Sequence, residues 1–361
     1  DLLAVLPGAT IDANGTAMNP IVFTSKEAAP DRQDWGGVII SGNATVNCGG
    51  MGTTCVGEGD TGSYGGMADD DNSGTMRYVR IEFGGKKINA TDELNGLALQ
   101  GVGSGTTLDY IHVHKSGDDG FEFFGGTVDA KHIIATGIGD DSFDWTFGWR
   151  GRVQYAIAQQ HADAGDQGIE ADNNEDDDPA QPRSNPIWSN MTLIGSPDST
   201  SSDIGILLRE GTGGQIWNTV VFAFNEFGLD IDDAETFNNA NATAGNLAIA
   251  NSVMCNATNF KDDMDDVFAA SAFFTDSTAF PGNVGNMAID TFPTCNLGIG
   301  TDATNETAPN FTPDMSSMLG SGGQVPTSAD NFFDTVTFRG AVEPGMQGAA
   351  GGAWWTWTSF P

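Results

Sequence analysis

Acidic side chains recur at a regular interval through the middle of the sequence, and their type and spacing suit metal binding. Each group adjoins a glycine or serine at 120, 142 or 168. The groups are Asp118, Asp119 and Glu122; then Asp140, Asp141 and Asp144; then Asp163, Asp166, Glu170 and Asp172. Ca²⁺ is a hard ion that accepts about six to eight oxygen ligands in a flexible geometry. The pattern therefore predicts calcium as a cofactor held by these carboxylates.

Two interpretations of these carboxylates stay open at this point. If the groups lie on neighbouring turns of a solenoid, about 4.8 Å apart, they form a ladder of like charges that a cation would stabilise. Aspartates at turns also accept local hydrogen bonds from the backbone, and such turns need no ion. We favour the calcium interpretation because the like charges repeat at coil spacing.

The histidines and basic residues offer weaker chemical signals. His112 and His114 are two apart on a predicted strand and face one side, so with His132 they form a candidate transition-metal site. Hydrogen bonds to Asp109 or Asp129 are the more ordinary role for these histidines, and we favour that role.

No set of residues has the diagnostic spacing of a catalytic site. Asp141 and Asp144 form one candidate acid pair, and Lys131, Arg150 and Arg152 are candidates for β-elimination from a uronate polymer beside calcium. Neither set matches a known spacing, so we assign no catalytic residue.

These side chains are carried by a repeat in which a short strand, a turn, a β-branched strand and a polar loop follow one another. Its equivalent positions lie 24, 22, 26, 37 and 23 residues apart, and they are Gly96, Gly120, Ser142, Gly168, Gly205 and Gly228. A period in the low twenties without an amphipathic helix is typical of a β-solenoid. The longest interval contains residues 172–186, which we expect to form a loop extruded from one coil.

The repeat predicts an all-β fold: a right-handed parallel β-helix with loop insertions and a short C-terminal helix. We expect a single domain over residues 1–361, with irregular coils over 1–93, regular coils over 94–232, and irregular coils with an aromatic cap over 233–361. The helix is expected over 262–274. Trp354, Trp355 and Trp357 are expected to cap the last coil, in preference to forming a carbohydrate platform. A stacked core is expected from Phe121, Phe123, Phe124, Phe143, Trp145, Phe147 and Trp149.

The charge of the chain excludes some partners. Lys and Arg total 14 against 49 Asp and Glu, which gives a formal net charge of −35. Nucleic acid and anionic membranes would be repelled. No apolar run approaches the length of about 18 residues that spans a bilayer, so no transmembrane segment is expected.

The four cysteines point to an oxidising compartment. Cys48 and Cys55 are seven residues apart, and Cys255 and Cys295 are forty apart. An even number with local partners predicts two disulfides, although four cysteines allow three connectivities. We therefore expect an extracellular protein or one on the bacterial outer surface.

Several segments resemble a known family. Residues 77–83 (RYVRIEF), 118–122 (DDGFE) and 139–144 (GDDSFD) are similar to a family of bacterial secreted and cell-surface β-helix proteins, and more distantly to pectate lyases and polygalacturonases. The resemblance implies the fold and the location, and little about a reaction. The catalytic motifs of those enzymes do not carry over, because only Gly139-Asp140-Asp141 resembles one element of them.

Three functions are consistent with the sequence. The favoured one is a non-enzymatic surface or matrix protein, such as an adhesin, coat component or filament subunit, stabilised by calcium. Its partners would be other copies of itself or cell-surface and matrix glycans. The alternatives are a polysaccharide lyase or glycoside hydrolase on the same scaffold, and a non-catalytic glycan-binding or metal-binding module. Repetition along the whole chain and the absence of a catalytic set favour the first.

Overall fold

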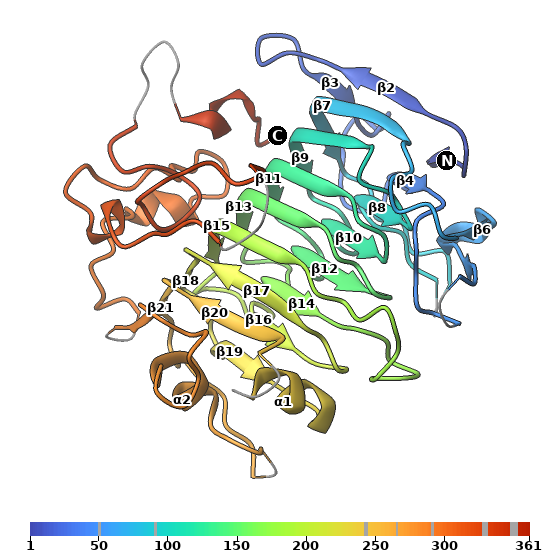
Figure 1. Cartoon of the computed structure of the whole chain (residues 1–361). Coiled ribbons are helices and arrows are strands. Elements are labelled where there is room, and N and C mark those ends of the chain that lie inside the picture. The colour runs from blue at the N-terminus through green and yellow to red at the C-terminus, as the bar shows by residue number, and fades with distance from the viewer. Residues whose placement is uncertain are drawn as a thin grey trace.

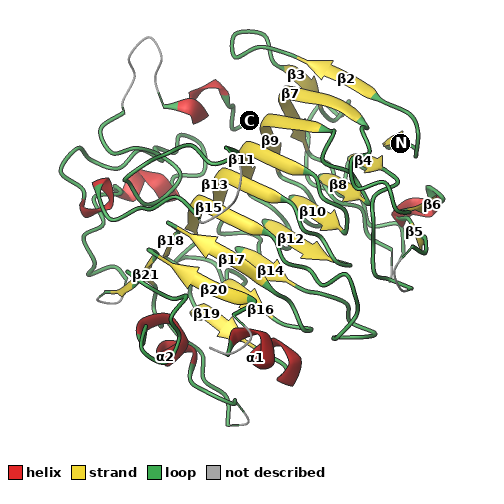
Figure 2. Ribbon diagram, viewed as in Figure 1, coloured by secondary structure: helices red, strands yellow, loops and turns green. Residues whose placement is uncertain are grey.

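The structure is a computed structural model that describes residues 1–49, 52–89, 92–241, 245–264, 266–289, 292–326, 331–346 and 353–361. Its body is a stack of coils in which parallel strands of successive coils lie side by side (Figures 1 and 2). The predicted fold class, a right-handed parallel β-helix, is confirmed. Two long sheets run along the stack, and a small antiparallel hairpin of β5 (Cys55–Val56) and β6 (Ser63–Tyr64) lies outside it.

The first sheet has eight strands, and the small residues of the repeat lie just before or at the start of six of them. In spatial order the strands are β1 (Leu3–Val5), β4 (Val38–Ser41), β8 (Leu97–Gln100), β10 (Phe121–Phe124), β12 (Phe143–Thr146), β14 (Ile169–Ala171), β16 (Ile204–Leu208) and β19 (Phe227–Ile231).

The register of this first sheet agrees with the repeat read from the sequence. Leu97 lies opposite Phe121, and Phe121 lies opposite Phe143, so the small residue that precedes each of them is also aligned. A Cβ atom on Gly120 would lie 2.6 Å from the carbonyl oxygen of Ser142. Small residues recur here because neighbouring backbones approach too closely for a larger side chain.

The second sheet has twelve strands, several of them bent. They are β2 (Ile11–Asn14), β3 (Ile21–Phe23), β7 (Gly74–Glu82), β9 (Thr107–His114), β11 (Asp129–Thr136), β13 (Arg152–Gln159), β15 (Ile187–Ile194), β17 (Gly214–Trp217), β18 (Val220–Phe222), β20 (Leu247–Ala250), β21 (Val253–Cys255) and β22 (Met287–Ala288).

One residue per coil interrupts the pairing of this second sheet, and it turns the chain through a corner. Each such residue has a φ between 49° and 67°. We call them the bend row: Tyr78, Tyr110, His132, Tyr155, Asn190, Asn218 and Asn251.

The interior of the coils is filled by aromatic and aliphatic side chains. Trp145, Trp149 and Trp188 are fully buried, and the ring of Phe123 stacks on Trp149 with centroids 4.0 Å apart. The predicted core is confirmed for five of its seven members. Phe124 and Phe147 instead pack outside the first sheet, in a separate cluster that includes residues of the β5–β6 hairpin.

Helices are few and short. Among the described residues, the two α-helices are α1 (Ala234–Ala240) and α2 (Ala270–Thr275), and four 3₁₀ turns cover Glu58–Asp60, Thr301–Thr304, Met318–Gly320 and Trp354–Trp357. The helix expected over 262–274 is shorter than predicted and begins later. Its acidic start lies outside the helix, where Asp262 Oδ1 accepts a hydrogen bond from the amide of Ala270 at 2.8 Å. Residue 265 lies outside the described residues.

Two disulfides join the four cysteines, as predicted. One links Cys48 to Cys55 and the other links Cys255 to Cys295. In the described part of the chain, helices are too short and too polar to cross a membrane.

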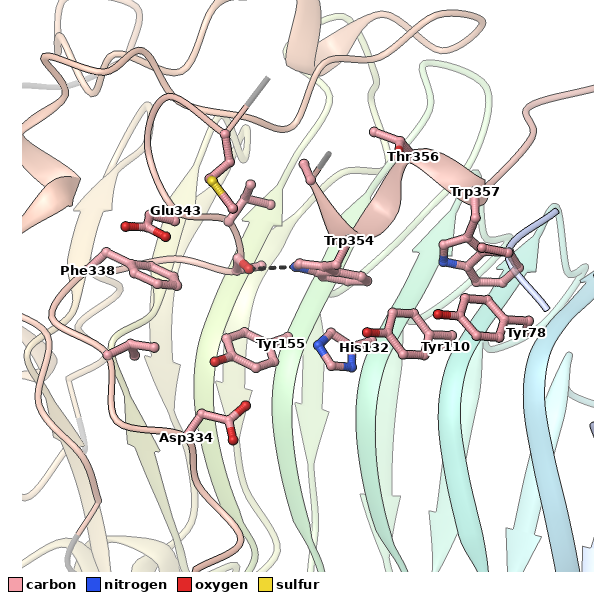
Figure 3. Close-up of a pocket in the computed structure, with 16 residues that line it drawn as sticks. Tyr78, Tyr110, His132, Tyr155, Asp334, Phe338, Glu343, Trp354, Thr356 and Trp357 are labelled. Atoms are coloured by element: carbon pink, nitrogen blue, oxygen red, sulfur yellow. Dashed lines mark hydrogen bonds between the residues drawn. The ribbon is translucent and has the colours of Figure 1, made fainter. Parts of the chain in front are cut away.

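The end of the chain folds back along the bend row. We call residues 324–326, 331–346 and 353–361 the C-terminal strap. Trp357 packs edge-on against Tyr78 with centroids 5.5 Å apart, and Trp354 packs against His132 at 5.1 Å. The predicted aromatic cap over the last coil is therefore wrong, because these tryptophans lie beside the coils of β7 and β11 (Figure 3).

Candidate functional site

The outer surface of the first sheet presents a row of carboxylates. Side chains alternate along a strand, so Phe121 and Phe123 point into the core while Glu122, between them, points outward. Glu122, Asp144 and Glu170 are aligned on β10, β12 and β14. With their neighbours they form what we call the carboxylate ladder: Glu58, Asp118, Asp119, Glu122, Asp140, Asp141, Asp144, Asp166, Glu170 and Asp172.

The turn before each strand supplies a second row of the ladder. The amide of Asp141 donates to Asp119 Oδ1 at 3.0 Å, and the amide of Gln167 donates to Asp141 Oδ1 at 2.6 Å. In the coil before them, Asn95 Oδ1 accepts from the amide of Asp119 at 3.1 Å. One oxygen of each aspartate thus links two coils, which leaves the second oxygen of Asp119 and of Asp141 for another partner.

Four triads in the described residues place carboxylate oxygens within 4.8 Å of one another. One of them, Asp230, Asp232 and Asp263, lies apart and pairs with Lys261, whereas the other three overlap along the ladder. These three are Asp118, Asp119 and Asp140; Asp119, Glu122 and Asp144; and Asp140, Asp141 and Asp166. Asp119 and Asp140 each belong to two triads. The three triads of the ladder therefore form a continuous chain of oxygen ligands along the stack rather than separate pockets.

The centre of the ladder is deeply buried. The exposed fractions are 7% for Asp119, 8% for Glu122, 4% for Asp141 and 7% for Asp144. Asp144 Oδ1 is buried and has no hydrogen-bond partner. Because an unpaired buried carboxylate is costly, this oxygen requires a partner, which can be a proton, a cation or a bound water.

The same burial shifts the acidities of the ladder. Burial, followed by the charge of neighbouring carboxylates, raises the pKa of Asp119, Glu122 and Asp144 well above the ordinary values. For the same two reasons the pKa of Asp118 is raised to about 7, and that of Glu170 to about 7. Without a cation, the ladder therefore retains protons near neutral pH.

One end of the ladder has a basic partner. Arg209 places Nη2 2.7 Å from Glu170 Oε2 and Nε 3.0 Å from Asp172 Oδ1. A cavity of about 260 Å³ opens beside this pair, and its lining includes Glu122 and Asp144. The ion pairs offset part of the cost of burying Glu170 and Asp172, whereas the three triads lie closer to the middle of the stack.

Sequence reasoning missed four participants. Glu58 enters from the hairpin insertion, burial raises its pKa to about 8, and Asn95 Nδ2 donates to its Oε2 at 3.1 Å. Arg209 and Glu210 line the cavity. The repeat could have identified Asn95, because Asn95 precedes Gly96 in the same way that Asp119 precedes Gly120. No feature of the sequence indicated Glu58, since it lies outside the repeat.

Asp163 is the one predicted ligand that the structure places elsewhere. It follows β13 of the second sheet and is ion-paired with Arg32, whose Nη2 lies 2.9 Å from Asp163 Oδ1. Its side chain is 65% exposed. The other predicted ligands adjoin strands of the first sheet, so Asp163 lies on a different side of the coil despite its proximity in sequence.

The candidate transition-metal site does not form. His112 Nε2 and His114 Nδ1 each lie 2.8 Å from Thr136 Oγ1, and burial lowers the pKa of both rings. His132 instead lies 2.8 Å from Asp109 Oδ1, as the more ordinary interpretation predicted.

The candidate bases for β-elimination also lie away from the ladder. Lys131 pairs with Asp334 at 3.1 Å, and Arg150 pairs with Asp69 at 3.2 Å. Arg152 pairs with Asp129 on β11. Lys131 and Arg152 belong to strands of the second sheet, and Arg150 lies just before β13 of that sheet. All three are held in these ion pairs, so none of them could serve a substrate bound at the carboxylates.

Comparisons with known proteins assign the β-helix to a family. Residues 1–294 match the family described as "Pectate-lyase like beta helix domain". The crystal structure of pectate lyase Pel9A is similar over 95% of this chain and 88% of that one, with 14% identity and a TM-score of 0.41. Among curated proteins, a comparison finds no match. The family match covers most of the coils described above, and the chain therefore belongs to the pectate-lyase-like β-helix family.

Proposed function

We propose that this chain is an extracellular calcium-binding β-helix protein that serves as a rigid surface or matrix scaffold. The observation that carries the proposal is the buried chain of triads, in which oxygens of Asp119, Glu122 and Asp144 lie within 4.8 Å of one another and Asp144 Oδ1 has no hydrogen-bond partner. A divalent cation would satisfy these oxygens and offset the repulsion between neighbouring coils.

The donor set favours calcium over other metals. Each triad consists of carboxylates alone, and nitrogen or sulfur ligands of the kind that zinc prefers are absent from the described triads. Magnesium needs a near-ideal octahedron and retains several waters. Shared carboxylates on successive coils suit the irregular, higher coordination of calcium.

Other features support the extracellular scaffold. Disulfides persist in oxidising compartments, and the structure contains two. Parallel pairing continues from β1 to β19 in the first sheet without a break, which gives the long, stiff body that a surface or matrix component requires.

Metal content provides the direct test of this proposal. We expect the full chain, dialysed against calcium and then against metal-free buffer, to retain up to three calcium ions, one for each overlapping triad of the ladder. Elemental analysis measures the content, and thermal melting with and without chelator measures the stabilisation. A sample free of calcium, whose melting temperature does not respond to the ion, would contradict the proposal.

The cavity beside Arg209 favours a second candidate function, that of a polysaccharide lyase. In β-elimination a cation holds the uronate carboxylate while a basic group removes the neighbouring proton. Burial lowers the pKa of Arg209, but hydrogen bonds and charge from Asp172 and Glu170 outweigh it and raise the pKa above its ordinary value. Arg209 therefore holds its proton firmly, and we rank this function second.

Product formation separates the two functions. We expect polygalacturonate incubated with the calcium-loaded protein to give no unsaturated uronate, which is followed by its ultraviolet absorbance. Accumulation of that product by the wild type, and its loss in an Arg209→Ala variant, would establish the lyase and remove the non-catalytic part of the first proposal.

A further inference from the structure

A second site lies on the bend row, away from the carboxylate ladder. The row and the C-terminal strap enclose a groove of about 590 Å³ (Figure 3). Its floor consists of Tyr78, Tyr110, His132 and Tyr155, and the strap forms the opposite wall with residues that include Trp354 and Trp357. None of the lining residues belongs to the carboxylate ladder.

The floor is a continuous aromatic stack with one ring per coil. Tyr78 and Tyr110 stack at 4.3 Å, Tyr110 and His132 at 4.2 Å, and His132 and Tyr155 at 4.9 Å. The planes differ by 11°, 7° and 17° respectively. The stack follows the strands of β7, β9, β11 and β13, so the groove is elongated along the axis of the coils.

The bend row changes from aromatic residues to asparagines where the groove ends. Its next residue, Asn190, donates from Nδ2 to the carbonyls of Phe338 and Gly340 at 3.1 and 3.2 Å. Asn218 likewise donates to the Gln324 carbonyl at 2.8 Å. Asparagine tolerates a positive φ, whereas tyrosine rarely adopts one. The first four coils of the row thus place aromatic rings where asparagine would be less strained, and there the strap contacts the row through Trp354 and Trp357, with the groove beside these contacts.

The wall of the groove is held in place without a ligand. Trp354 Nε1 donates to the Ala341 carbonyl at 2.8 Å. The amide of Asp334 donates to Gln154 Oε1 at 2.8 Å, and Gln154 Nε2 donates back to the Asp334 carbonyl at 3.2 Å. Such preorganisation lowers the entropic cost of binding. The strap lies beyond residue 294, where the family match ends, so the groove is an addition to the family scaffold.

The chemistry of the lining selects the ligand. The lining contains tyrosine hydroxyls and the carboxylates of Asp334 and Glu343, and no lysine or arginine. A polyanion would be repelled, and Lys131 already pairs with Asp334, which weakens the attraction for a cation. The floor rings cover one another's faces, so they present their edges and the tyrosine hydroxyls to the groove. Hydroxyls and carboxylates exchange hydrogen bonds with sugar hydroxyls, and the ring edges supply apolar contact. We propose that the groove binds a neutral oligosaccharide chain lying along the bend row.

Calorimetric titration of the full chain with uncharged hexasaccharides of glucose, xylose and mannose tests this site. We expect at least one to bind, and hexagalacturonate, the charged comparator, to give no heat. Tyr110→Asn removes a ring from the floor but keeps a residue that the row uses at 190, 218 and 251. This variant should bind about tenfold more weakly. The control, Trp217→Ala on β17 outside the groove, should bind as the wild type does.

A second variant keeps the test decisive if Tyr110→Asn does not fold. Glu343 is exposed, so Glu343→Ala leaves packing intact while removing an acceptor from the wall; it should also weaken binding. Absence of heat with all three neutral sugars would overturn the proposal. So would wild-type affinity in both folded variants, or hexagalacturonate binding that equals that of the neutral chains. Since the groove and the ladder share no residue, chelation of calcium should leave sugar binding unchanged.

Discussion

The Asp119→Asn variant should lose most of the rise in melting temperature that calcium gives the wild type. Asp119 belongs to two of the three triads, so one substitution removes an oxygen charge from both. A saturated site contributes about 2.7 kcal/mol when free calcium is about 100 times its Kd. Loss of two sites therefore removes a large part of the calcium-dependent stability.

The same substitution should not lower the melting temperature of the calcium-free protein. Asn95 occupies the equivalent position one coil earlier, and its Oδ1 accepts a hydrogen bond from the amide of Asp119 at 3.1 Å. Asparagine at 119 can accept from the amide of Asp141 in the same way, and it removes one of several neighbouring like charges. We expect the calcium-free variant to melt at or above the temperature of the calcium-free wild type.

Asp163→Asn is the matched control, because Asp163 is exposed and paired with Arg32 outside the ladder. Differential scanning calorimetry at matched calcium concentrations compares the three proteins. If Asp119→Asn and Asp163→Asn retained the same calcium response as the wild type, the triads would not be the calcium sites.

The second large effect concerns pH: the calcium-free protein should become less stable between about pH 4 and pH 8. Burial raises the folded-state pKa of Asp118 to about 7, of Glu170 to about 7 and of Glu58 to about 8, whereas unfolded carboxyls titrate near 4. A raised folded-state pKa stabilises the fold fully below the unfolded value. That stability is lost as the pH rises through the folded value.

Calcium should abolish this decline. The ion takes the place of the protons, so its binding releases protons near neutral pH and the loaded protein keeps its stability as the pH rises. Melting temperatures recorded across this range, with chelator and with saturating calcium, give two curves that diverge toward pH 8. Parallel curves, or a chelated protein that gains stability toward pH 8, would argue against the raised acidities and the calcium sites together.

The coil register could be predicted because the same local requirement recurs on every coil. Close backbone approach demands a small residue at Gly96 and Gly120, and inward positions such as Phe121 demand large apolar ones. Those two constraints fix the alignment of the strands. The ladder follows from this alignment, because residues at equal offsets from the small residue must stack.

Other parts of the site depend on contacts that sequence spacing does not encode. Asp163 lies within a few residues of Asp166, yet it belongs to the other side of the coil. Arg209 reaches Glu170 across 39 positions, and Glu58 arrives on an insertion. The bend row was missed because its members share a backbone conformation, while their side chains vary between tyrosine, histidine and asparagine.

The strap changes how the solenoid should unfold. In a simple solenoid each coil contacts only its neighbours, so one end can fray while the other stays folded. Here a single segment contacts Tyr78 through Trp357, His114 through Pro361, Asn190 through Phe338 and Asn251 through Arg339. Loss of either end would break contacts along the whole length. The strap thus couples the two ends of the solenoid, so that they should unfold cooperatively and not fray one at a time. It can dock only after the coils have assembled.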